Sequence, residues 1–92
     1  MNQELNDLGI EISAYVYELH DLTKVIKDMD AEIIKNSTDE NKLLMQEVID
    51  RYKSSVNRLR VLLECYFDVE QKNSIPTDFS FRKLYKQLKA AY

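Results

Sequence analysis

Apolar residues alternate at spacings of three and four along the first third of the chain. They are Leu5, Leu8, Ile12, Tyr15, Leu19, Leu22, Ile26, Met29 and Ile33. This spacing keeps one side of an α-helix apolar over about four heptads, as in a coiled coil or a helical bundle. A long helix with one apolar stripe must bury that stripe against another helix, and this requirement constrains the fold more than any other feature.

A second apolar run with the same spacing lies in the middle of the chain. Its members are Met45, Ile49, Tyr52, Val56, Leu59, Leu63 and Tyr66. Between the two runs, Asn36 favours a helix C-terminus, and Ser37 and Glu40 have the spacing of a capping box. A loop of only a few residues makes the two helices antiparallel. The sequence therefore predicts a helical hairpin formed by residues 4–35 and 39–72.

A third, shorter helix is predicted over residues 78–91. Pro76 ends the second helix, Thr77 is the expected N-cap, and Asp78 suits the positive end of a helix. Its apolar stripe is Phe81, Leu84, Tyr85, Leu88 and Tyr92. The helix is long enough to cover about half of the hairpin. Extra apolar residues predict that it covers the end away from the loop; they are Ile10, Ala14, Tyr17, Leu62, Cys65, Phe67 and Val69.

Composition supports this architecture. One glycine and one proline among 92 residues leave too few turn signals for a β fold. The chain is therefore expected to be one all-α domain over residues 1–92, a three-helix bundle that dimerisation completes to a larger bundle. A single cysteine excludes an internal disulfide, and we find neither a secretory leader pattern nor an apolar run long enough to span a membrane. These features favour a cytoplasmic protein.

No residue pattern indicates catalysis or metal binding. His20 is the only histidine, and its helical position predicts that it is exposed. Cys65 lies in an apolar stretch, so we expect a buried, inert thiol. No Gly-rich phosphate loop or Glu-x-x-His pair is present. We therefore expect no catalytic residue, no cofactor and no metal, and a protein that is not an enzyme.

The hairpin half next to the loop is the predicted contact surface. The third helix does not reach it, and a bare pair of helices buries little apolar area. Apolar residues that project beyond the seam there are Val25, Ile34, Leu44 and Val48. We expect them to contact a second copy of the chain, as a homodimer, or another protein. The predicted function is that of a protein–protein interaction module: a small adaptor, chaperone, inhibitor or complex subunit.

Charge divides unevenly along the chain. The first fifty residues carry twelve acidic and four basic side chains, and residues 51–92 carry four acidic and nine basic ones. The simplest interpretation is attraction between the two halves. In that case Glu4, Glu11 and Glu18 pair with bases of the third helix, and the bases at 51, 58 and 60 balance the first helix.

The alternative is a nucleic-acid contact made by the basic third helix. The bases are Arg82, Lys83, Lys86 and Lys89. The aromatic residues left as candidate contacts are Tyr17, Phe79 and Tyr92. A sequence pI of about 5.1 disfavours nucleic acid as the main partner.

Two resemblances involve the last third of the chain. Val56-Asn57-Arg58-Leu59, followed by Ile75-Pro76 and a short helix with leucine spacing, is similar to class IIa bacteriocin immunity proteins. That resemblance implies a small immunity-like helical bundle. Those proteins are four-helix bundles, whereas the first apolar run here continues through the place where they turn. The three-helix layout also resembles BAG domains, which bind Hsp70-type chaperones, although Arg82 and Gln87 do not match that family's charged pairing.

Overall fold

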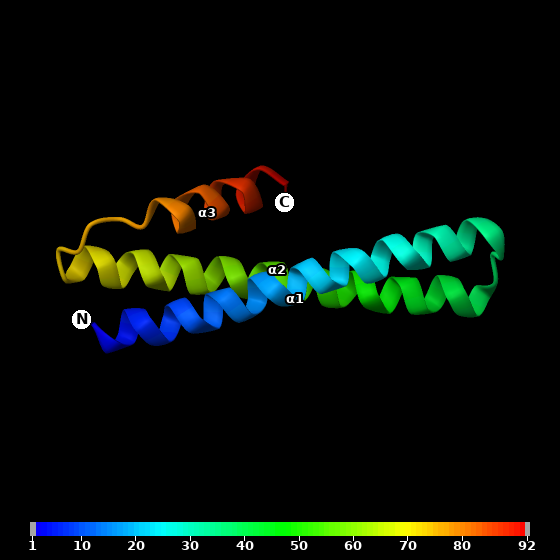
Figure 1. Ribbon diagram of the computed structural model, residues 1–92, viewed down its shortest axis with the longest axis horizontal. Helices are drawn as coiled ribbons and strands as arrows, with labels where there is room; N and C mark the ends of the chain where they lie inside the picture. The colour runs from blue at the N-terminus through cyan, green and yellow to red at the C-terminus, as the bar shows by residue number, and fades with distance from the viewer. Residues whose placement is uncertain (1, 92) are drawn as a thin grey trace.

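Three helices make up the computed structural model, which describes residues 2–91. Helix α1 is Gln3–Lys35, α2 is Asp39–Lys72 and α3 is Phe79–Ala91. The two long helices form an antiparallel hairpin, and α3 folds back along α2 (Figure 1). The predicted all-α fold, a long hairpin with a shorter third helix, is confirmed. Each predicted helix boundary lies within one residue of the observed one.

The caps of α2 and α3 differ from the predicted ones. Thr38, not Ser37, is the N-cap of α2, and its hydroxyl oxygen accepts a hydrogen bond from the Asn41 N–H at 3.1 Å. Asp78 takes the corresponding role in α3, where Thr77 was expected: its Oδ1 accepts from the Phe81 N–H at 3.0 Å. At both helix starts, two adjacent residues carry a side-chain oxygen that can accept from the first helical turn. The residue at which the helix begins determines which of them is the N-cap.

Asn36 ends α1 without the left-handed backbone that its residue type favours. Its φ is −146° and its ψ is 83°, and its N–H donates to the Glu32 carbonyl. The non-glycine residue with a positive φ in the described chain is Ser74, at 54°, in the loop before α3. The hairpin loop thus reverses the chain without a left-handed residue, whereas the α2–α3 loop uses one.

The core is concentrated in the half of the hairpin away from its loop. Buried apolar side chains there are Ile12, Leu19, Val56, Leu59, Leu62, Leu63, Phe67 and Val69. Seam residues near the loop are only half-buried; they are Ile26, Met29, Ile33, Met45 and Ile49. The molecule measures 54 × 23 × 15 Å, and its radius of gyration of 16.5 Å exceeds the roughly 12 Å of a compact domain of this length. The loop half is therefore a bare helical pair, as predicted.

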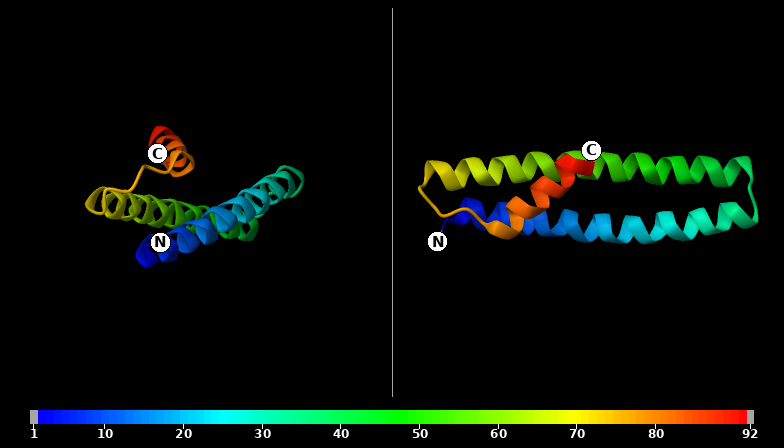
Figure 2. Two further views of the ribbon diagram at one scale, coloured as in Figure 1. Left: turned by 60° about the vertical axis from the view of Figure 1, so that its left-hand side comes forward. Right: turned by 90° about the horizontal axis from the view of Figure 1, so that it is seen from above.

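Helix α3 packs on α2 and not on α1. Seen from above, it runs obliquely to the hairpin, and its C-terminal end lies over α2 (Figure 2). The rings of Phe81 and Tyr66 meet edge to face at 4.9 Å, and those of Tyr85 and Phe67 at 5.6 Å. Because these α2 rings occupy the apolar stripe of α3, little of that stripe is left for α1. The prediction that α3 also covers Ile10 and Tyr17 is wrong, since these side chains are 63% and 73% exposed.

Gly9 is the chain's one glycine, and it lies inside α1 where nothing requires it. A Cβ built there meets only the Tyr66 ring, at 3.9 Å, which is an ordinary contact. We expect Gly9→Ala to raise the free energy of unfolding by about 0.5–1 kcal/mol, because alanine restricts the unfolded chain and favours helix. Thermal melts followed by circular dichroism will measure this. An unchanged or lower melting temperature would show that the site needs a bare backbone.

Candidate functional site

Two ion pairs connect α1 and α2 along one face of the hairpin. Arg51 bonds Glu18 at 2.9 Å, and Arg58 lies 3.6 Å from Glu11. From one pair to the next, α1 advances seven residues while α2 goes back seven, as antiparallel helices require. The predicted balance between these arginines and the acidic first helix is confirmed for both. Arg60 instead donates to Asn57 within α2.

This face points away from α3. Arg58 precedes Phe67 by nine residues, or about two and a half helical turns. The two side chains therefore lie on opposite sides of α2. Phe67 contacts α3 through both Tyr85 and Arg82. The side of the hairpin that carries the ion pairs is consequently open along its length.

One heptad closer to the loop, the positions equivalent to Glu18 and Arg51 carry apolar side chains in place of charged ones. Seven residues beyond Glu18 is Val25, and seven residues before Arg51 is Leu44. Both remain exposed, at 43% and 45%, and Val48 lies half-buried one turn after Leu44. We call Val25, Leu44 and Val48 the tip face. Helical register thus brings together three of the four residues predicted as a contact set.

Ile34, the fourth predicted contact residue, belongs to a different surface. It follows Val25 by nine residues, so it lies half a turn away on α1. Its side chain is 79% exposed. Leu43 is also exposed near the loop and was not among the predicted contact residues. Ranking apolar residues by distance from the seam would have found it.

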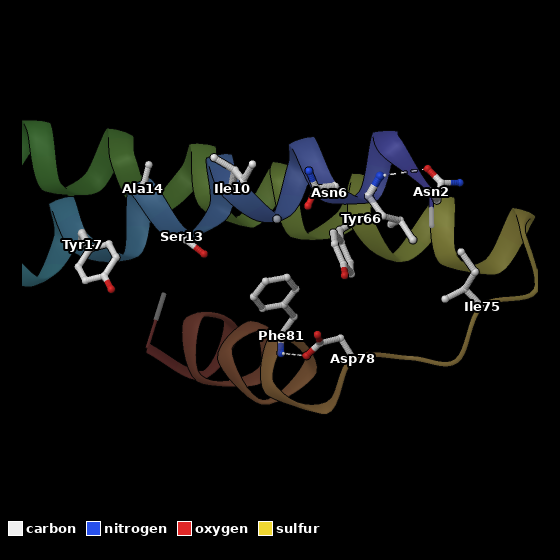
Figure 3. Close-up of a pocket in the computed structure, with 12 residues that line it drawn as sticks. Asn2, Asn6, Ile10, Ser13, Ala14, Tyr17, Tyr66, Ile75, Asp78 and Phe81 are labelled. Atoms are coloured by element: carbon white, nitrogen blue, oxygen red, sulfur yellow. Dashed lines mark hydrogen bonds between the residues drawn. The ribbon is translucent and has the colours of Figure 1, made fainter.

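A groove of about 1000 Å³ runs between α1 and the start of α3. In Figure 3, Phe81 and Tyr66 stand at one wall, and Ile10, Ser13, Ala14 and Tyr17 follow the other. The α1 wall carries no charged side chain between Asn2 and Tyr17 among the groove-lining residues. The groove exists because α3 packs on α2 alone, which the sequence did not predict.

The basic residues of α3 form no ion pair with the part of the chain that the structure describes. The expected pairs of α3 bases with Glu4, Glu11 and Glu18 do not form. Glu11 and Glu18 instead pair with arginines of α2. Within residues 2–91 no carboxylate lies within ion-pair distance of the α3 bases. Instead, the guanidinium of Arg82 stacks 4.2 Å from the Phe67 ring centre, and Lys89 Nζ lies 5.3 Å from that of Tyr85.

Phe79 stands at the first position of α3 and is 87% exposed. Arg82, Lys83 and Lys86 follow at spacings of three, four and seven, so they share its side of the helix. All three are exposed. We call Phe79, Lys83 and Lys86 the α3 outer face; Arg82 lies at its edge, where its guanidinium packs on Phe67 of α2. The other two aromatic candidates do not belong to this face. Tyr17 lies at the groove, and Tyr92 lies outside the described residues.

The contacts of α3 raise the pKa values of two tyrosines. The Tyr85 hydroxyl donates to Glu64 at 2.6 Å, and this hydrogen bond raises the pKa of Tyr85 above its usual value. Burial raises the pKa of Tyr66, with further increases from the carboxylates of Asp78 and Glu70. Both hydroxyls therefore keep their protons to a higher pH than a free tyrosine does. They are structural groups that attach α3 to α2.

The chain's one histidine and its one cysteine both lie on the surface. His20 is exposed, as predicted. Cys65 is exposed, so the prediction of a buried thiol is wrong. The reason is its register: it follows Arg58 by seven residues and shares the face that α3 leaves open. No group of three or more metal-ligating side chains occurs in the described chain.

A comparison with known protein families, curated proteins and solved structures finds no match to this chain. The unbroken α1 also departs from the four-helix layout of bacteriocin immunity proteins. None of the helices between residues 2 and 91 is long and apolar enough to cross a membrane.

Proposed function

We propose that this chain is a non-enzymatic helical interaction module that forms a homodimer through its tip face. The supporting observation is that equivalent positions along the hairpin change from charged to apolar side chains toward the loop. Two successive cross-helix positions carry ion pairs, and the third carries the exposed apolar pair Val25 and Leu44. Solvated charges suit a free surface, whereas an exposed apolar pair favours a covering partner.

A second copy fits this surface in a simple way. The tip face is open, and the half of the hairpin that carries it has no fully buried side chain of its own. Packing two such hairpins about a two-fold axis sets the same residues of each copy against one another and gives a four-helix bundle. The dimer then buries side chains that a monomer leaves half-exposed. The exposed thiol of Cys65 fits a reducing compartment, so we place the module in the cytoplasm.

The test is the oligomeric state of Leu44→Asp. We expect light scattering with size exclusion to give twice the 10.9 kDa chain mass for the wild type and the single mass for the variant. A buried carboxylate in an apolar interface is strongly unfavourable. Because Leu44 is exposed in the monomer, helicity by circular dichroism should stay unchanged.

Ile34→Asp is the matched control. It places the same charge in the same half of the hairpin, on the other side of α1, and we expect it to remain dimeric. A wild type that stays monomeric up to submillimolar concentration would refute the homodimer. Equal dissociation by both aspartate variants would refute the assignment of the tip face.

A further inference from the structure

Helix α3 carries an unusual concentration of unpaired positive charge. Its thirteen residues include four bases and no acid, and α3 contributes +4 to a chain whose net charge is −3, so the rest carries −7. Arg60 of α2 adds a fifth base near Tyr85. Two acids that contact α3 make other interactions: Glu64 accepts from the Tyr85 hydroxyl, and Asp78 caps the helix.

Intramolecular attraction does not explain these charges. The interpretation in which the two halves neutralise each other holds for Arg51 and Arg58, which pair with α1. It does not hold for α3, whose bases keep no carboxylate partner in the described chain. Two of them are oriented by aromatic rings, which leaves their charge unneutralised. A basic helix of this kind favours a polyanionic ligand.

The exposed ring of Phe79 indicates that the polyanion also carries a group that can stack on an aromatic ring. Lys83 and Lys86 lie on the same side of α3, one and two helical turns further along. Proteins that bind single-stranded nucleic acid combine such elements, with cations on the phosphates and an aromatic ring on which a base stacks. We infer that the α3 outer face binds single-stranded nucleic acid, with Lys83 and Lys86 on the phosphates and Phe79 beneath a base.

An anionic membrane fits this face less well. A membrane-binding amphipathic helix buries a whole apolar stripe in the lipid. The stripe of α3 is already packed on α2, through Phe81 and Tyr85. Phe79 is then the single large apolar side chain left on the outer face. A duplex, whose bases are stacked inside, gives the Phe79 ring no partner either.

The experiment measures binding of a labelled oligo-dT about 20 nucleotides long by fluorescence anisotropy at several salt concentrations. We expect wild-type affinity to fall with salt with a logarithmic slope of about −1.4, as for two phosphate contacts. Lys83→Glu/Lys86→Glu should weaken binding at least about tenfold and flatten that slope. Phe79→Ala should weaken binding about tenfold and keep the slope, because it removes stacking and no charge.

The matched control is Lys24→Glu/Lys27→Glu, which makes the same charge change on exposed positions of α1. It should weaken binding by less than about threefold, because salt screens distant charges. Failure of the wild type to bind oligo-dT at low salt would overturn the inference. So would tighter binding to a duplex of mixed sequence or to phosphatidylserine vesicles, or an unchanged affinity of Phe79→Ala. The result does not depend on the tip-face dimer, since the two surfaces lie on different sides of α2.

Discussion

Ile12→Ala is expected to destabilise the protein by about 3–4 kcal/mol, and Ile33→Ala by only about 1–2 kcal/mol. Both isoleucines occupy the same position of the α1 heptad, three heptads apart. Ile12 is fully buried against the core, whereas Ile33 is half-buried near the hairpin loop. Removing three buried carbon atoms leaves a cavity at Ile12, while solvent fills the space at Ile33. A loss of this size is a large part of the total stability of a small domain.

The pair is well matched because helix propensity changes equally at both positions. The free energy of unfolding is measured by urea titration, followed by circular dichroism, at concentrations low enough to keep the chain monomeric. Melting temperatures should follow the same order, with a shift of about 4–8 °C per kcal/mol for a domain of this size. Equal losses at the two positions would show that the loop half is packed as tightly as the other half, against the observed burial.

The hairpin was predictable because its determinants are local and repeated. Nine apolar residues in α1 and seven in α2 follow the same alternation of three- and four-residue spacings. A single short loop then sets which residues of the two helices face one another. Each further heptad adds the same information, so an error of one residue at Asn36 or Ser37 does not change the fold. The exposure of Val25 and Leu44 was predictable for a related reason. Val25, Leu44 and Val48 follow from the register once the hairpin is accepted.

The placement of α3 was not predictable in the same way. Its stripe fits either α1 or α2, and the choice depends on ring contacts such as Phe81 with Tyr66. Residues that are apolar by type, Ile10 and Cys65, therefore seemed suited to cover by α3 and are instead exposed. The unpaired bases of α3 follow from the same choice. With α3 on α2, the acids of α1 are out of reach and pair with Arg51 and Arg58.

Glu70→Ala is expected to detach α3 from the hairpin, at a cost of about 2–3 kcal/mol. Glu70 is 3% exposed, and its Oε2 accepts a hydrogen bond from the Asp78 N–H at 2.9 Å. Its backbone carbonyl accepts from the Ile75 N–H, also at 2.9 Å. This one residue therefore holds the α2–α3 loop and the N-cap of α3. Hydrogen exchange should show faster exchange across α3 in the alanine variant, while α1 amides away from α3 keep their protection.

Glu70→Gln separates the hydrogen bond from the charge. The glutamine side-chain oxygen can still accept from Asp78, so α3 should stay attached. The other carboxylate oxygen, Oε1, is buried and has no hydrogen-bond partner in the described chain. Glutamine removes a buried charge but puts an NH2 group without a partner in the place of Oε1. These two effects oppose each other, so stability should change by less than about 1 kcal/mol. If glutamine loosens α3 as much as alanine does, the negative charge itself holds the loop, and the helix-capping hydrogen bond does not.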